Sequence, residues 1–379
     1  MYNFPNVQVF MPFLVNYRAY IWRFCDFFVP LHSIMILHVF NPEHDIALAA
    51  NLSNFTAPHA GRQLRADLGF LPALWAGDGD AILVDNVDCA RHRYARLRNK
   101  VRGGLPLLVD KHQLSRLDIE RVDPWGWDLA LCAQLRRYGV VNLPDESYVT
   151  EVRTLSHRRT AVRLLPQLRQ EGTVGESYEC SNDVEVARLL DHYGQLVLKA
   201  PWSSSGRGLR FLSKDHTPLA MQAGWLRNVI AQQGSVIAEP YYQKVKDFGM
   251  EFTVDASHVV HYEGLSLFHT QNGAYVGNVI ATEARKNEMI TRYVPAVLLK
   301  SIQQKICRQL CLGSYVGPFG VDMMVVAANE GFLLHPCVEV NLRRTMGHVA
   351  LTQAPDDDDV CKVMRIHLED NYKLKIQKL

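Results

Sequence analysis

Cysteine pairs, excess charge of one sign and long apolar runs are all scarce in this sequence. Its 379 residues include eight cysteines. None forms a Cys-x-x-Cys pair, which indicates reduced thiols of a cytoplasmic protein and no structural zinc. With 41 basic and 39 acidic residues the net charge is only +2, so the composition gives no argument for nucleic acid. The basic stretch Arg91–Lys100 is best interpreted as the solvated face of a helix, with a nucleic-acid-binding module as the alternative.

The first 34 residues also lack a membrane signature. They are rich in aromatic and apolar residues, but Arg18, Arg23 and Asp26 break any span of about 18 apolar residues. They have no basic start and no clear cleavage site of a signal peptide. A strand-like run begins at Met35. We therefore expect residues 1–34 to be an upstream extension outside the functional protein, with a membrane-associating segment as the alternative.

The rest of the sequence alternates strand and helix patterns, which predicts an α/β (α+β) fold. Residues 35–153 read as a small α/β domain with a partly parallel sheet, with strands at 81–85 and 105–109. A second region begins near Thr154, and a third begins near Phe252. The second region is the better defined by its helix and strand signals. It contains a helix after Asn182 that Gly194 ends, then strands at 195–200, 209–212 and 236–238. The tail 356–379, with four successive aspartates and several lysines, is expected to be solvated surface.

Two alternating stretches, Gly320–Met324 and Val338–Arg343, flank a turn at Ala327–Gly331 and predict a β-hairpin. A two-residue loop places Asp322 directly opposite Glu339, and a four-residue loop makes them diagonal neighbours on the same face. Asn341 shares that face, because side chains repeat every two residues in a strand. Two facing carboxylates repel each other. A divalent cation between them removes the repulsion, and a neighbouring amide oxygen suits Mg²⁺; an ordinary half-exposed strand is the alternative.

A Gly/Ser-rich stretch, Pro201–Gly208, joins two predicted strands, so it is not a Walker loop, which runs into a helix. A glycine-rich hairpin can still fold over a triphosphate, because its backbone N–H groups reach phosphate oxygens. Lys199 ends the strand before it, in an otherwise apolar run. A lysine there needs an anionic partner or an exit to water.

These stretches, taken in order, resemble the ATP-grasp superfamily, which includes D-alanine–D-alanine ligase, biotin carboxylase and glutathione synthetase. The matching stretches are Leu198–Pro201, Ser203–Gly208, Ile237–Tyr241, Gly320–Asp322 and Val338–Arg343. The resemblance covers roughly 154–355. It implies an ATP-grasp fold whose two α+β subdomains grip ATP, preceded by the small α/β domain at 35–153.

The resemblance also implies roles for single residues. Lys199 and Arg343 are the expected catalytic residues: Lys199 binds phosphate oxygens, and Arg343 stabilises the transferring phosphoryl group. Arg158 stands where the family often has an ATP-binding lysine, and Glu251 resembles an acidic position after the hinge. The metal ligands for Mg²⁺, with Mn²⁺ as a substitute, are Asp322, Glu339 and Asn341. The nucleotide-binding residues are Arg158, Lys199, Ser203, Ser204, Ser205, Gly206, Arg207, Gly208, Glu239 and Tyr241.

The function that follows from the resemblance is an ATP-dependent ligase. ATP converts a substrate carboxylate into an acyl phosphate, and an amine or other nucleophile then displaces phosphate. The expected partners are a small-molecule or peptide carboxylate and the nucleophile, with no nucleic acid and no membrane; dimers are common among such proteins. The alternatives are a kinase of the same fold that phosphorylates a small molecule, and a nucleotide-binding protein without catalysis.

Substrate-facing residues are harder to find. Arg344 and His348 follow Arg343 and either face the acceptor or are polar residues of the surface or core. The segment 41–45, which ends in His44-Asp45, lies where a preceding domain touches substrate or forms a structural turn. Trp125-Gly126-Trp127 is interpreted as packing rather than as a platform for stacking a base.

Overall fold

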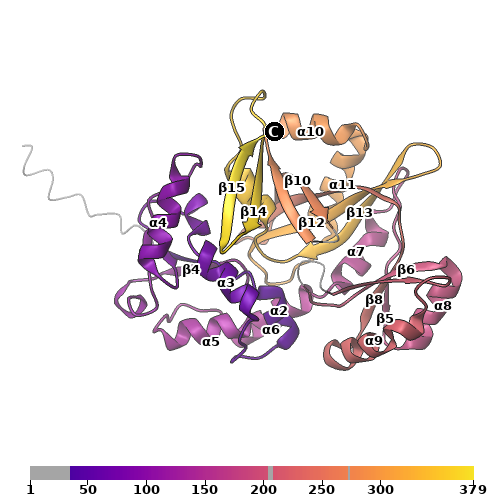
Figure 1. Ribbon diagram of the computed structural model, residues 1–379, viewed down its shortest axis with the longest axis horizontal. Helices are drawn as coiled ribbons and strands as arrows, with labels where there is room; N and C mark the ends of the chain where they lie inside the picture. Colours follow the sequence, from indigo (N-terminus) through magenta and orange to yellow (C-terminus); the bar gives the residue numbers. More distant parts are fainter. Residues whose placement is uncertain (1–34, 204–207, 272–273) are drawn as a thin grey trace, which may run out of the picture.

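The computed structural model describes residues 35–203, 208–271 and 274–379. The prediction for residues 1–34 lies outside these ranges and stays a prediction. Three β-sheets organise the chain (Figure 1). Among the described residues, no helix is both long and apolar enough to cross a bilayer.

The N-terminal part contains a four-stranded parallel sheet of order β3-β2-β1-β4, in line with the α/β pattern. Buried aliphatic side chains fill one face, where they pack against α5. The elements are β1 Ile36–Val39, α2 His44–Ala50, α3 His59–Leu68, η2 Leu71–Leu74, β2 Ala81–Leu83, α4 Val87–Arg98, β3 Leu107–Val109, η3 Leu114–Arg116, β4 Arg121–Pro124, α5 Leu129–Arg137 and α6 Glu146–Leu155.

A small antiparallel sheet of order β5-β8-β6-β7 follows, covered by α8 and α9 (Figure 1). The predicted helix signals hold here. The Asn182 side chain caps α8 by accepting from Glu185 N at 3.0 Å, and Gly194 ends the helix with φ of +75°. The elements are α7 Arg159–Leu168, β5 Tyr178–Cys180, α8 Asp183–Tyr193, β6 Gln195–Lys199, β7 Leu209–Ser213, α9 Leu219–Gln233 and β8 Val236–Pro240.

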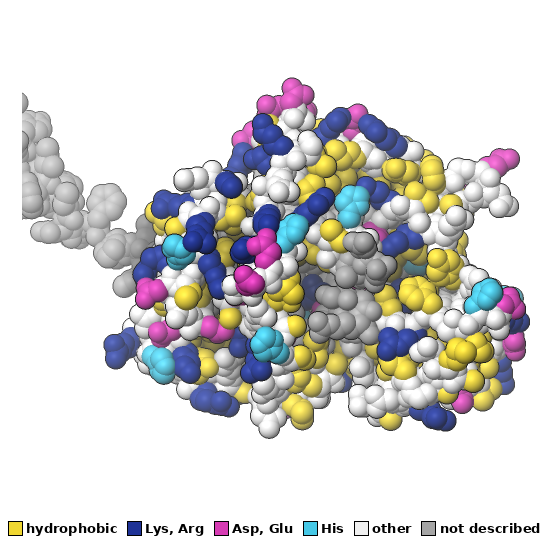
Figure 2. Space-filling view, in the orientation of Figure 1, with side chains coloured by type: hydrophobic (Ala, Val, Ile, Leu, Met, Phe, Trp, Pro, Cys, Tyr) yellow, Lys and Arg dark blue, Asp and Glu magenta, His cyan; other side chains and the backbone are white. Residues whose placement is uncertain are grey.

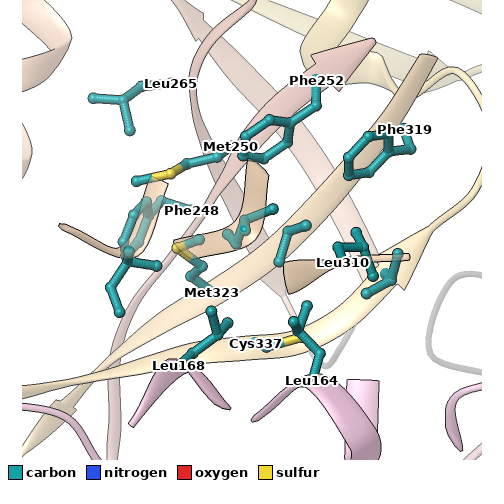
Figure 3. Packing of buried hydrophobic residues seen from close by; sticks show 14 of the residues in the cluster. Leu164, Leu168, Phe248, Met250, Phe252, Leu265, Leu310, Phe319, Met323 and Cys337 are labelled. Atoms are coloured by element: carbon teal, nitrogen blue, oxygen red, sulfur yellow. The ribbon is translucent and has the colours of Figure 1, made fainter. Parts of the chain in front are cut away.

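The largest sheet has seven antiparallel strands in the order β13-β12-β9-β10-β11-β14-β15. Its core is one buried cluster that includes Leu164 and Leu168 of α7, Phe248 of β9 and Phe319 of β12 (Figure 3). The elements are β9 Lys244–Val254, β10 Val260–Gln271, β11 Ala274–Ile280, α10 Glu283–Thr291, α11 Ala296–Gln309, β12 Gly317–Ala327, β13 Phe332–Asn341, α12 Met346–Thr352, β14 Lys362–Leu368 and β15 Tyr372–Lys378.

The expectation of a solvated C-terminal tail is wrong for residues 362–378. They form β14 and β15, which extend the large sheet from β11. Met364 and Leu374 are buried against Phe40 and Trp125 of the N-terminal part. The lysines of β15 alternate with the apolar residues Tyr372, Leu374 and Ile376, which is the pattern of a strand with one exposed face.

Charged side chains of both signs are interspersed on the face of the molecule in Figure 2. No large surface of a single sign stands out there, in keeping with the net charge of +2. A mixed surface of this kind gives little long-range attraction for a polyanion.

Candidate active site

Lys199 is the last residue of β6 and lies in the small sheet beside Glu239 of β8. The strands pair Val197 with Glu239, so Lys199 and Glu239 project from the same face. Lys199 Nζ lies 2.6 Å from Glu239 Oε2, and both residues are buried, at 7% and 4% exposure. A lysine in an apolar strand needs an anionic partner. Here that partner is Glu239, another of the predicted site residues.

The Gly/Ser-rich stretch connects β6 to β7 as an antiparallel hairpin, as predicted. Ala200 N donates to Gly208 O at 2.8 Å where the hairpin closes. A Cβ at residue 208 would collide with the Ser203 side chain, so the close approach of the two arms requires glycine there. The predicted nucleotide-binding residues Ser204, Ser205, Gly206 and Arg207 lie outside the described residues.

Tyr241 follows β8 at the predicted hinge. Its N–H donates to Gln195 O at 3.1 Å, and the residue is about half exposed. The ring lies edge-on to Phe211, with centroids 6.2 Å apart. The two aromatic side chains give this end of the site an apolar lining.

The acidic hairpin has the four-residue loop of one prediction and the direct Asp322–Glu339 pairing of the other. Four residues, 328–331, separate the paired Ala327 and Phe332, yet Asp322 pairs directly with Glu339. The register shifts because three residues of β13, with Pro336 first, oppose the single Met323 of β12. Proline has no N–H for the ladder and is tolerated at such a bulge.

The predicted metal ligands contact one another and two arginines. Asn341 Nδ2 donates to Asp322 Oδ2 at 3.0 Å, and Arg158 Nη2 lies 2.8 Å from Glu339 Oε1. Burial and the nearby Glu339 carboxylate raise the pKa of Asp322 to about 7, against the Asn341 hydrogen bond and the Arg343 charge. Asp322 is thus held near the balance between its protonated and charged forms.

Arg343 is fixed by a residue from the far end of the sequence. Its Nε and Nη2 donate to the two carboxylate oxygens of Asp45 at 3.0 and 2.9 Å, and Nη2 also donates to Asn341 Oδ1 at 3.0 Å. Burial alone would raise the pKa of Asp45, but the Arg343 guanidinium lowers it. The segment 41–45, expected to be either substrate-facing or a turn, turns at residues 42–43 and then enters α2. Asp45, in the first turn of that helix, orients a predicted catalytic arginine.

Glu251 of β9 belongs to the same face of the large sheet, opposite Gly320. It is buried, at 3% exposure, and burial with the neighbouring Asp322 charge raises its pKa to about 8. A Cβ at residue 347 would collide with its carboxylate. The start of α12 therefore approaches Glu251 closely only because residue 347 is glycine.

The two other substrate candidates have roles inside the protein. Arg344 stacks on Trp75, 4.6 Å from its centroid, and pairs with Asp123 at 3.0 Å. His348 is buried, and its Nδ1 accepts from Thr345 N at the cap of α12. Neither residue lines the cavity described next.

A cavity of about 520 Å³ lies between the small and large sheets and is closed on one side by the N-terminal part. That side is formed by residues of the β1–α2 connection, with Leu64 and Trp125. Nine of the residues predicted to be catalytic, nucleotide-binding or metal-binding line it. They are Arg158, Lys199, Ser203, Glu239, Tyr241, Asp322, Glu339, Asn341 and Arg343.

No family model matches the chain, and no curated protein matches it. Solved structures do. Biotin carboxylase from Campylobacter jejuni, in a complex with ATP, matches 88% of this chain and 75% of its own at 14% identity and a TM-score of 0.50. The chain has the ATP-grasp fold. Two further matches are weaker. N5-carboxyaminoimidazole synthetase from Staphylococcus aureus has a TM-score of 0.49 at 13% identity over 88% and 82% of the chains. An ATP-grasp superfamily protein from Archaeoglobus fulgidus has 0.45 at 13% identity over 91% and 99%.

Within the ATP-grasp fold, sequence reasoning missed the polar residues that β9, β10 and β11 add to the cavity. Asp247 and Lys244 pair at 2.6 Å, and the buried Asn278 donates to Ser266 Oγ at 2.8 Å. Asp247 and Glu251 lie four residues apart on one strand, a spacing that places both on the same face. This spacing is the sequence signal that could have identified Asp247 as a neighbour of Glu251 in the site.

Trp125-Gly126-Trp127 serves packing, as interpreted from the sequence. Trp125 meets Phe40 edge-on at a centroid distance of 5.0 Å. A Cβ at residue 126 would lie 2.6 Å from the His44 ring, so glycine allows α2 to approach. Trp125 also lines the cavity.

Proposed function

We propose that this protein is an ATP- and Mg²⁺-dependent ligase that activates a carboxylate as an acyl phosphate. One observation carries the proposal. A single cavity brings Lys199 and Arg158 together with the facing carboxylates of Asp322 and Glu339. A cavity that combines cationic side chains with a pair of facing carboxylates suits a nucleotide bound as its metal complex. The fold is similar to that of biotin carboxylase in its β-γ-ATP complex, which supports a nucleotide in this cavity.

The donor set fits a magnesium ion. Asp322, Glu339 and the Asn341 amide supply oxygen ligands from one strand pair, and Mg²⁺ is held by one or two carboxylates with phosphate oxygens and water. The raised pKa of Asp322 has the nearby Glu339 charge among its causes, and a bound cation would relieve that repulsion. When bound, the ion neutralises the charge that develops on the phosphates.

The remaining roles belong to side chains of this chain. Lys199 and Arg158 would bind phosphate oxygens, exchanging their present carboxylate partners Glu239 and Glu339 for the nucleotide. The Ser203–Gly208 hairpin would cover the triphosphate, and Tyr241 would lie against the base. Arg343, oriented by Asp45, would stabilise the transferring phosphoryl group.

The reaction has two steps. An oxygen of the substrate carboxylate attacks the γ-phosphorus of ATP, which gives the acyl phosphate and ADP. The amine nitrogen then attacks the carbonyl carbon, phosphate leaves, and the nitrogen loses its proton. As part of the same proposal, residues 154–355 bind ATP, and residues 35–153 with Asp45 close the substrate side of the cavity.

A substrate screen tests this function. ADP release is followed for a panel of small carboxylic acids and peptides, each with a panel of amines and with magnesium. We expect ADP release that depends on both a carboxylate and an amine, with an amide as product. A stable phosphorylated product without an amine would indicate the kinase instead, and nucleotide binding without any turnover would leave only a binding protein.

A further inference from the structure

A second cavity, of about 270 Å³, lies wholly within the N-terminal part. It is enclosed by α2, the 53–57 segment, α3 and α5; these three helices lie together at the lower left of Figure 1. It shares no lining residue with the cleft between the sheets. Asn41 and Glu43 line the second cavity, whereas Pro42 and Asp45 line the cleft. The β1–α2 connection therefore separates two distinct spaces.

The position of this cavity in the parallel sheet is one where ligands bind. From β1 the chain moves outward to β2 and β3, and it then returns to the other side of β1 to form β4. The strand order thus reverses between β1 and β4. Asn41 and Glu43 follow the carboxyl end of β1, and Asp128 follows that of β4. Open α/β sheets bind ligands at the carboxyl ends of the strands beside such a reversal.

Glu43 supplies the cavity with an acceptor that lacks a partner. The residue is only 7% exposed. Its Oε1 accepts from Arg65 Nη1 at 2.6 Å, but its buried Oε2 has no hydrogen-bond donor among the described residues. Asp128, also buried, already accepts from Leu131 N and Asn41 Nδ2. A buried carboxylate oxygen without a donor is costly, and a ligand that carries an ammonium group would satisfy it.

The outer part of the same cavity is basic. Arg62 and Arg137 both line it and are exposed. Neither forms an ion pair or a side-chain hydrogen bond within the described part of the chain. Two free guanidinium groups from different helices, α3 and α5, suit a carboxylate. The cavity therefore has inside it an acceptor oxygen without a donor among the residues that the structure describes, on a carboxylate that Arg65 already pairs with, and two guanidinium groups at its edge.

We propose that this cavity binds a free α-amino acid. Its ammonium group donates to Glu43 Oε2, and its carboxylate pairs with Arg62 and Arg137. Ala47, Phe55 and Leu131 line the remaining wall and accommodate a small apolar side chain. The volume of 270 Å³ is just below the range of about 300–1,000 Å³ typical of small-molecule sites, which suits a ligand of this size. The proposal is independent of the reaction in the cleft.

Calorimetric titration of the full chain without nucleotide tests it. Each proteinogenic α-amino acid is titrated at millimolar concentration, and the strongest binder is compared with its Nα-acetyl and α-carboxamide derivatives. We expect binding of the free amino acid and at least a roughly tenfold loss for each derivative, since each lacks one charged partner. Failure of every amino acid to bind would overturn the proposal.

Four variants locate the binding. Glu43→Gln and Arg137→Gln should each weaken binding by roughly tenfold or more. Arg136→Gln, the matched change one residue away and outside the cavity, should not. Arg137 is exposed, so its variant decides the matter even if Glu43→Gln fails to fold. Binding that survives both cavity variants, or that Glu339→Gln in the cleft abolishes, would show that the amino acid does not bind here.

Discussion

At the scale of single residues, the cleft is a set of buried charges that neutralise one another in pairs. Lys199 is paired with Glu239, and Arg158 with Glu339. Both cations are proposed to bind phosphate, so nucleotide binding must exchange one anion for another. Each carboxylate can therefore be tested separately from its partner.

Glu339→Gln should abolish Mg²⁺-dependent ATP turnover. The change keeps the shape of the side chain but removes the charge that a cation needs, and loss of one group that stabilises developing charge costs about 10²–10³-fold in rate. ADP release with saturating magnesium measures it. The control is Glu330→Gln, an exposed glutamate in the turn of the same hairpin. Turnover unchanged in Glu339→Gln would remove Glu339 from the metal site.

Lys199→Met should destabilise the protein, because it leaves the Glu239 carboxylate buried without a counter-charge. Breaking one partner of a buried pair costs about 3–5 kcal/mol. The double variant Lys199→Met/Glu239→Gln should recover most of the stability, but not the affinity for ATP. Denaturant unfolding and calorimetric ATP titration distinguish the two effects. Equal stability of the single and double variants would contradict this account.

At the scale of elements, the sequence predicts the acidic hairpin but not the bulge within it. Alternation in 320–324 and 338–343 predicts which side chains share a face, and Asp322 faces Glu339 as expected. The bulge beside Pro336 could not be placed, because two loop lengths fit the same pattern. The last two strands were predicted wrongly for another reason. The run of aspartates and lysines is typical of solvated surface, and the alternation of Tyr372, Leu374 and Ile376 with those lysines was not weighed against it.

Deletion of residues 361–379 should cause a large loss of stability or of soluble protein. Without β14 the edge of β11 is exposed, and the buried Met364 and Leu374 are lost from the core. Burial of two such side chains contributes roughly 3–6 kcal/mol. Soluble yield and thermal unfolding measure the effect. Asp359→Asn, an exposed change just before the strand, serves as the control and should have no effect. A truncated protein as stable as the full chain would mean that β14 and β15 do not stabilise the sheet.

At the scale of the whole molecule, contacts distant in sequence join the N-terminal part to the large sheet. Asp45 and Arg343 are separated by 298 residues, and Asp123 and Arg344 by 221. Neither pair belongs to a local pattern, because patterns of period 2 or 3.6 describe one element at a time. The order of the motifs could be read from the sequence. The residues that orient Arg343 and Arg344 could be identified only from the folded structure.

Asp123→Asn should lower the free energy of unfolding by an amount that depends on pH, because it weakens the contact between the N-terminal part and the large sheet. Asp123 Oδ2 lies 2.9 Å from His38 Nδ1 and 3.0 Å from Arg344 Nη2. Burial would raise the pKa of Asp123, but Arg344 and His38 outweigh it and lower the pKa. A lowered carboxyl pKa contributes stability above the unfolded pKa, about 3.9, and that contribution is lost as the pH falls through the folded pKa.

The variant should therefore cost about 1–3 kcal/mol at neutral pH, and the difference from the parent should shrink as the pH falls below about 4. Denaturant unfolding of both proteins between neutral pH and pH 3 measures it, with the exposed Asp118→Asn as the matched control. A cost that stayed constant over this range would show that the carboxylate charge does not stabilise the junction. In that case the contact between Arg344 and the Trp75 ring, 4.6 Å from its centroid, would be left to hold Arg344 at the junction.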